Sequence, residues 1–318
     1  MDVAIWFFRE QCHWARTGFG ALPVLGDTDR YQSALSAFGR VEPLHTLPTE
    51  PRPPRGSTTD APPHGGQRPQ TAGSITLERL TFAYPGRPPV LRNVSLNFPA
   101  ARVTAIVGPT GAGKTTITKL LMQFHEPDQG RILLDGTDVR ELPLHDLRRT
   151  IGYVSQEPHL FDATIADNIR YGAFETTHEQ LVAAARTAGA DAFIGRLPDG
   201  YATLVGERGA ALSGGQRIAL ARTILRDPPV VLLDEATSAV DNETEAVIHD
   251  ALTTFGQDRT MIVIAHRLST VRSAHRIHVL DHTGRITEQG THQQLVRRNG
   301  LYATLWRLQS GRPVRTMP

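Results

Sequence analysis

Residues 108–116 read Gly-Pro-Thr-Gly-Ala-Gly-Lys-Thr-Thr, and this stretch decides the fold of the chain. It fits the phosphate-binding pattern G-x-x-x-x-G-K-[ST], with an apolar, β-branched run before it (103–107) and a helical pattern after it (116–122). A strand that feeds a glycine-rich turn into a helix presents unpaired N–H groups to an anion. A chance glycine-rich turn is the alternative interpretation, and the motifs that follow argue against it.

The residue types of the loop predict how a nucleoside triphosphate is held. Glycines let the backbone close around phosphate oxygens, Lys114 places a positive charge at the β- and γ-phosphates, and the hydroxyl of Thr115 suits Mg²⁺. We therefore predict ATP and Mg²⁺ as cofactors. The predicted nucleotide-binding residues of the loop are Gly108, Pro109, Thr110, Gly111, Ala112, Gly113, Lys114, Thr115 and Thr116.

A second predicted strand ends in two adjacent carboxylates. The stretch Pro229-Val-Val-Leu-Leu-Asp234-Glu235 is apolar up to its last two residues. A strand buried on both faces carries acids only at its C-terminal end, which is where ligands bind in open α/β sheets. Asp234 suits the Mg²⁺ shell, and Glu235 suits the polarisation of an attacking water. An acidic pair at the start of a helix is the alternative, and the preceding apolar run disfavours it.

Leu212-Ser-Gly-Gly-Gln216 is a polar, glycine-rich entrance to a helix and a second candidate phosphate nest. Its place between the phosphate loop and the Asp-Glu strand makes it specific. This order of motifs resembles the nucleotide-binding domain of ATP-binding cassette (ABC) proteins over roughly the last three-quarters of the chain. The resemblance implies that such a signature acts on the nucleotide of a partner cassette. The residues it assigns to this contact are Ser213, Gly214, Gly215 and Gln216.

The resemblance assigns further residues by position. Tyr84, in Phe-Ala-Tyr-Pro, matches the aromatic residue that stacks on adenine. Gln156 matches the glutamine that reaches Mg²⁺ and the attacking water, and Asp241 matches the loop that crosses between two cassettes. His266 matches the switch histidine near the γ-phosphate, and it directly follows an apolar strand pattern at 261–264. Together with Glu235, Lys114 and Gln156, it completes the predicted catalytic set.

Three further stretches resemble the exporter branch of the family. Residues 203–209 are similar to the loop through which exporter cassettes contact intracellular extensions of their membrane helices. Residues 160–172 and 193–201 are similar to the helical subdomain of that branch. The resemblance therefore implies transmembrane permease subunits as partners, besides a second cassette.

One departure from the family pattern concerns the signature helix. In the family three residues usually separate the signature from the apolar body of its helix, whereas here Arg217 alone separates Gln216 from Ile218. A deletion of two residues rotates everything upstream by about 200° and retracts it by about 3 Å. Because Ile218 must keep its buried face, we expect the signature to point away from the partner's nucleotide unless the helix start unwinds.

Length and charge agree with a globular nucleotide-binding domain. The chain has 318 residues, 40% of them hydrophobic, and a formal net charge of +2. Acids and bases nearly balance, so we predict no nucleic-acid partner. The single cysteine, Cys12, excludes an internal disulfide and fits a reducing compartment. The sequence has no run of about 18 apolar residues that would cross a bilayer. The expected location is therefore peripheral, at the cytoplasmic face of the plasma membrane.

We predict an α/β fold, with a P-loop NTPase core built on a mainly parallel sheet. A small antiparallel β subdomain is expected near residues 75–100, and a helical subdomain near 156–225. Composition divides the chain into an N-terminal segment, a Pro/Gly-rich linker, the ABC ATP-binding domain and a tail, at residues 1–42, 43–73, 74–309 and 310–318. The first segment resembles the junction between a membrane domain and its cassette, and a disordered start is the alternative interpretation.

The leading functional hypothesis is an ATP-binding subunit of an exporter that hydrolyses Mg-ATP in a cassette dimer. A nucleotide-binding module with weak or no turnover, or a truncated exporter fragment, is the alternative that the short signature favours. A cassette protein of translation or DNA repair is a third hypothesis. It predicts tandem cassettes or a coiled-coil insertion, which the sequence lacks.

Overall fold

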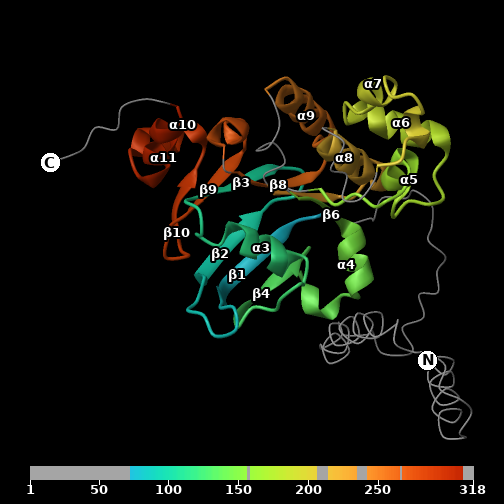
Figure 1. Cartoon of the computed structure of the whole chain (residues 1–318). Helices are drawn as coiled ribbons and strands as arrows, with labels where there is room; N and C mark the ends of the chain where they lie inside the picture. The colour runs from blue at the N-terminus through green and yellow to red at the C-terminus, as the bar shows by residue number, and fades with distance from the viewer. Residues whose placement is uncertain (1–71, 156–157, 206–213, 235–241, 266, 311–318) are drawn as a thin grey trace, which may run out of the picture. The chain divides into compact units, whose positions relative to one another are not determined.

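The computed structural model describes residues 72–155, 158–205, 214–234, 242–265 and 267–310. All of these residues lie in the second of the chain's two units, Thr58–Pro318. The predicted N-terminal segment, nearly all of the predicted linker and all but the first residue of the predicted tail are outside the described residues. Figure 1 shows two sheets with helices packed around them.

The larger sheet is mainly parallel, as the sequence predicts. Its strand order is β10-β9-β3-β8-β7-β6, and every pair is parallel except β10 with β9. All five residues of β7 are buried, which explains the continuous apolar run before its terminal acid. The strands are β3 (Val103–Val107), β6 (Ile151–Val154), β7 (Val230–Asp234), β8 (Thr260–Ile264), β9 (Arg276–Leu280) and β10 (Ile286–Gly290).

The smaller sheet is antiparallel and has the order β2-β1-β4-β5. Its strands are β1 (Ile75–Phe82), β2 (Leu91–Phe98), β4 (Gln129–Leu134) and β5 (Thr137–Asp138). The expected subdomain near residues 75–100 is therefore present, but it also recruits two strands from beyond the first helix. Apolar side chains of β1, β2 and β4 form one buried cluster with the helix that follows the phosphate loop.

Helices cover the larger sheet at both of its edges. A helical subdomain packs beside β6, with α8 contacting α5, α6 and β6, as expected for residues near 156–225. At the opposite edge α10 packs on β10 and α11 packs on α10 (Figure 1). The helices are α3 (Lys114–Leu121), α4 (Leu144–Thr150), α5 (Ile165–Arg170), α6 (His178–Thr187), α7 (Asp191–Ile194), α8 (Gly215–Arg226), α9 (Asn242–Phe255), α10 (His292–Arg298) and α11 (Leu301–Gln309), with short 3₁₀ turns η1 (Val139–Glu141), η2 (Gly200–Ala202) and η4 (Leu268–Val271).

Local sequence signals explain where several of these helices begin. Thr177 and Thr291 each accept a hydrogen bond from the backbone three residues on, while the glutamine there reaches back to the threonine N–H. Such reciprocal capping satisfies two N–H groups that a helix start otherwise leaves unpaired. In contrast, α3 starts at Gly113 with no side-chain cap, so its first N–H groups are left for another acceptor.

Candidate nucleotide-binding site

The candidate site lies at the C-terminal ends of the parallel strands. The register pairs Ile106 of β3 with Ile264 of β8, and Ile264 in turn with Asp234 of β7. Because these strands run in the same direction, the phosphate loop after β3 and the acid at the end of β7 both lie where the parallel strands have their C-terminal ends. Two motifs more than a hundred residues apart are thus brought together by strand pairing alone.

The phosphate loop has glycine where a side chain would collide with its neighbours. A Cβ at Gly108 would lie 2.3 Å from the carbonyl oxygen of Leu280, at the end of β9. A Cβ at Gly113 would lie 2.9 Å from the side chain of Leu91, and Gly113 has a left-handed φ of 98°. These approaches keep the loop tight over the start of α3, which is the geometry that presents backbone N–H groups to an anion.

Lys114 is held inside the phosphate loop. Lys114 is only 3% exposed, and its Nζ donates to the carbonyl oxygens of Gly108 at 2.9 Å and Pro109 at 3.0 Å. Burial lowers the pKa of Lys114 to about 8, and the carboxylate of Asp234 opposes this shift. The amino group is therefore preorganised at the loop, where an anionic ligand would favour its charged form.

Asp234 and Thr115 form the second part of the site. Burial raises the pKa of Asp234, whereas hydrogen bonding from Tyr153, the charge of Lys114 and a hydrogen bond from Thr115 oppose that shift. The Tyr153 hydroxyl donates to Oδ2 of Asp234 over 3.4 Å, and the pKa of this tyrosine is raised to about 12 by its burial and by the neighbouring carboxylate. A buried carboxylate thus faces the lysine and the hydroxyl of the loop.

This donor set fits Mg²⁺. The hydroxyl of Thr115 and the carboxylate of Asp234 offer hard oxygen ligands beside the loop. Mg²⁺ typically takes one or two protein oxygens and completes its shell with phosphates and water. Within the described part of the chain no group of three or more His, Cys, Asp or Glu side chains could hold a metal by itself. A metal that enters with a nucleotide agrees with both facts.

Tyr84 lies beside α3, on the flank of the loop. Its Oη is 3.2 Å from Oγ1 of Thr116, and the Nζ of Lys119 lies 5.6 Å from the centre of its ring. The rings of Phe82 and His125 meet Tyr84 nearly at right angles, with centroids 5.0 and 5.3 Å away. The half-buried ring is therefore fixed next to the predicted phosphate site, as an adenine platform requires.

Five predicted site residues are outside the described residues, and their roles stay predictions. They are Gln156, Ser213, Glu235, Asp241 and His266.

Comparisons with known proteins indicate the family of this domain. Residues 91–238 match the family model described as ABC transporter. The mitochondrial potassium channel ATP-binding subunit of Pongo abelii is 49% identical over 246 residues, which cover 76% of this chain and 34% of that protein. The ATP-dependent lipid A-core flippase of Chromobacterium violaceum is 47% identical over 248 residues, covering 77% of this chain and 42% of the flippase.

This chain contains an exporter-type ABC transporter ATP-binding domain. A solved bacterial Atm1-family ABC exporter with ATP bound superposes with a TM-score of 0.77 at 39% identity. That match covers 90% of this chain and 48% of the exporter. The chain thus spans less than half the length of these relatives. In the described residues, no helix is long and apolar enough to span a bilayer.

The described part of the ABC signature is packed against its own subunit. Gly214 is buried beneath the ring of Phe193 in α7, so that a Cβ on Gly214 would lie 2.4 Å from this ring. Arg217 covers the same ring, with its guanidinium carbon 4.6 Å from the ring centre, and donates to the Gly189 carbonyl at 3.3 Å. Gln216 is 7% exposed. That the signature points away from a partner's nucleotide, unless the helix start unwinds, stays a prediction, because Leu212 and Ser213 are outside the described residues.

The sequence alone does not predict several residues that lie beside the candidate nucleotide-binding site. Tyr153 lies on β6, and only the pairing of β6 with β7 brings it to Asp234. Lys119, in the last turn of α3, and His125, in the segment after α3, both contact Tyr84. The spacing from Lys114 to Lys119 places both on one helix, but no pattern in the sequence indicates that Lys119 covers an aromatic ring.

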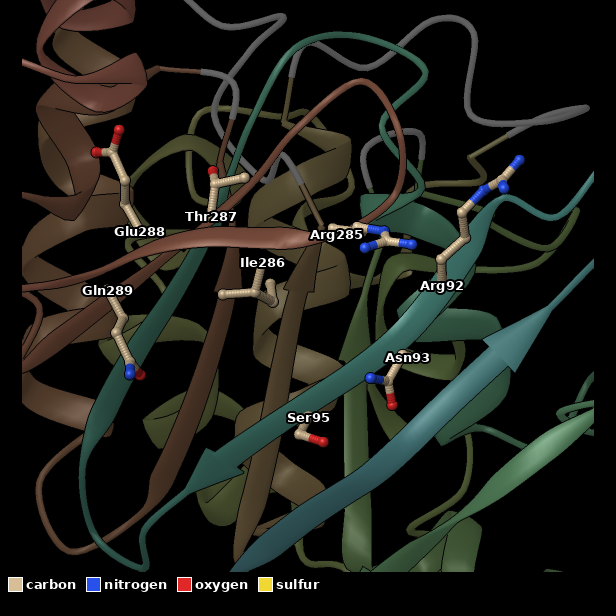
Figure 2. A pocket seen from close by; sticks show the side chains of 8 residues that line it. All are labelled: Arg92, Asn93, Ser95, Arg285, Ile286, Thr287, Glu288 and Gln289. Atoms are coloured by element: carbon tan, nitrogen blue, oxygen red, sulfur yellow. The ribbon is translucent and has the colours of Figure 1, made fainter.

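A separate groove lies between the outer strands of the two sheets. It has a volume of about 390 Å³ and is lined by Arg92, Asn93, Ser95, Arg285, Ile286, Thr287, Glu288 and Gln289. Figure 2 shows Arg92 and Arg285 at the same end of this groove. Glu288 also accepts hydrogen bonds from the N–H groups of Leu301 and Tyr302, so its carboxylate caps the start of α11.

Proposed function

We propose that this chain is the ATP-binding subunit of an ABC exporter and hydrolyses Mg-ATP in a cassette dimer to drive transport. The observation that carries the proposal is the joint placement of Lys114, Thr115 and Asp234 at one edge of the parallel sheet. A buried ammonium, an uncapped helix start and a carboxylate beside a hydroxyl together suit a triphosphate with its metal. The matches to exporter cassettes support the same chemistry.

Each predicted site residue has its own role in this proposal. Tyr84 stacks on adenine, the N–H groups at the start of α3 hold the phosphates, and Lys114 moves its ammonium from the loop carbonyls to the phosphate oxygens. Thr115, Gln156 and Asp234 hold Mg²⁺, which when bound neutralises charge on the β- and γ-phosphates.

The remaining tasks concern the attacking water and the charge that develops at the γ-phosphate. Glu235 orients or deprotonates the water, and His266 stabilises the developing charge. A second cassette supplies its signature to this nucleotide, and Asp241 contributes to the contact between the two cassettes. All of these groups act by position and electrostatics, which carry most of the catalysis in phosphoryl transfer.

An exposed aromatic cluster supports membrane subunits as partners. The cluster consists of Phe161, Tyr171 and Phe174, which are 36%, 48% and 69% exposed. The ring centre of Tyr171 lies 4.4 Å from that of Phe161 and 6.0 Å from that of Phe174. Arg222 underlies the cluster, 5.6 Å from the ring of Phe161, and donates to the Asn168 carbonyl at 2.8 Å. A rigid aromatic surface of this kind suits the end of a membrane-subunit helix. We propose a peripheral location at the cytoplasmic face of the plasma membrane.

The names of the relatives differ, since one is a lipid A-core flippase and another is the ATP-binding subunit of a potassium channel. The proposal therefore covers ATP use and leaves the transported substrate open.

A second candidate function is a nucleotide-binding module whose own signature contributes little. The burial of Gly214 beneath Phe193 favours it, because a glycine packed inside its own subunit has no backbone surface for a partner's phosphate. We propose that the two candidates combine in a heterodimer. Lys114, Glu235 and His266 then form the competent site with the complete signature of a different cassette, while the short signature faces the weaker site.

Replacing Glu235 with Gln tests the hydrolytic role. The variant is expected to bind ATP as the parent does but to accumulate as a nucleotide-bound dimer, since the ATP that joins the two halves is no longer consumed. Phosphate release measures the loss of turnover, and size-exclusion chromatography with Mg-ATP measures the accumulation of the nucleotide-bound dimer. Glu179→Gln on the exposed face of α6 is the matched control. Parental turnover in the Glu235 variant would refute the role of this carboxylate.

A further inference from the structure

The segment that carries Tyr84 is joined to a segment on the far side of α3. The first follows the end of β1, and the second comprises residues 122–128, which follow α3. The N–H of Asp128 donates to the Thr81 carbonyl over 2.9 Å, and the N–H of Ala83 donates to Oδ2 of Asp128 over 2.7 Å. The backbone next to Tyr84 is therefore held by the chain that leaves the phosphate-loop helix.

The same segment brings His125 against the tyrosine. The chain turns sharply after α3, because Gln123 has a left-handed φ of 52° and the N–H of Phe124 donates back to the last turn of the helix over 2.8 Å. The next residue is His125, whose ring meets that of Tyr84 at 88° with the centroids 5.3 Å apart. Perpendicular rings at this separation form a favourable edge-to-face pair.

The contacts of Tyr84 fix both the end and the plane of its ring. Its Oη lies 3.2 Å from Oγ1 of Thr116, which holds the end of the side chain. Rotation of the ring about χ2 is soft, so neighbouring groups must set its plane. The rings of Phe82 and His125 do so at 81° and 88°. Phe82 is 4% exposed and belongs to the core, whereas His125 is half-buried and can be replaced with less effect on the fold.

We propose that His125 is a positioning residue that sets the plane of the Tyr84 ring for stacking on adenine. The proposal rests on the proposed role of Tyr84 as the adenine platform. His125 acts through the tyrosine ring, so it raises the affinity for the base and contributes nothing to the binding of the phosphates. Because stacking depends on the angle between two rings, a tyrosine that can tilt loses part of this attraction.

The test compares the affinities of the full 318-residue chain for adenylyl imidodiphosphate, a non-hydrolysable ATP analogue, and for inorganic tripolyphosphate, which lacks the base. His125→Ala is expected to weaken the analogue about 2- to 12-fold, as for the loss of one aromatic pair, and to leave tripolyphosphate at its parental affinity. His125→Phe keeps a flat ring against Tyr84 and is expected to retain both affinities. Phe124→Ala is the matched control, because this neighbouring ring is 51% exposed and contacts the guanidinium of Arg148.

Combining Tyr84→Ala with His125→Ala tests the route of the effect. If the histidine acts through the tyrosine, the double variant binds the analogue no more weakly than Tyr84→Ala alone. Additive losses overturn the proposal, and so does an equal loss for tripolyphosphate, which marks a structural role. If Tyr84→Ala weakens the analogue while His125→Ala does not, only the His125 proposal fails. If Tyr84→Ala binds the analogue as the parent does, the proposed adenine platform fails first.

Discussion

The phosphate loop and the signature helix are both glycine-rich helix starts, yet the fold treats them oppositely. At α3 the glycines bring the backbone close to β2 and β9, and the first N–H groups stay uncapped next to Lys114. At α8 the glycine before the helix lies beneath Phe193, and Arg217 covers the same ring. Neither helix start has a side-chain cap, but the first lies beside Lys114, whereas the second packs against Phe193 and Arg217 of its own subunit. A glycine-rich motif therefore acquires its function from the surface it faces.

The largest expected effect is at the first helix start. Lys114→Ala removes a charge-assisted contact and is expected to weaken ATP binding by about 1.5–3 kcal/mol, or about 10- to 150-fold. Isothermal calorimetry measures this change. Lys119→Ala removes the same charge five residues further along α3 and is expected to cost at most about 1 kcal/mol, through its contact with Tyr84. Equal losses in both variants would show a general charge effect instead of a phosphate cradle.

The second helix start predicts a stability difference between adjacent glycines. A methyl group at Gly214 would meet Phe193 at 2.4 Å, whereas one at Gly215 would meet Pro158 at an ordinary 3.5 Å. Gly214→Ala is therefore expected to lower the free energy of unfolding by about 1–3 kcal/mol. Gly215→Ala is expected to be neutral or to stabilise by up to about 1 kcal/mol. Chemical denaturation compares the two, and equal stabilities would mean that Gly214 faces solvent.

A smaller effect is expected from pH at the phosphate loop. Burial lowers the pKa of Lys114 to about 8, so its ammonium loses its proton as the pH rises through that value. Because a triphosphate binds the charged form, binding takes up a proton above pH 8. Affinity at pH 9 is expected to be about tenfold below that at pH 7. Fluorescent-nucleotide titrations at several pH values measure how affinity depends on pH, and this dependence should vanish in Lys114→Ala. A dependence that persists in this variant would assign the titration to another group.

The two regions also differ in how far the sequence predicts them. The phosphate loop and the strand ending at Asp234 follow from short patterns, because β-branched runs and fixed glycines are local signals. The contact of Tyr153 with Asp234 depends on strand order, and the contact of Gly214 with Phe193 depends on how α7 packs on α8. The antiparallel sheet extends past its predicted bounds for the same reason, since β4 returns to β1 only after α3. Local patterns predict elements, and long-range packing decides their neighbours.

The most direct test of the difference between the starts of α3 and α8 is to restore the spacing of the signature helix by inserting Gln-Arg after Arg217. The insertion rotates the preceding residues by about 200° relative to the buried body of α8 and thereby takes Gly214 out from under Phe193. We predict that ATP turnover of the homodimer rises on the order of tenfold or more, as expected when donors to a phosphate are restored. ATP affinity of the monomer should stay within about twofold, because the signature does not touch its own subunit's nucleotide. Turnover equal to that of the parent, at equal folding and dimerisation, would contradict the account.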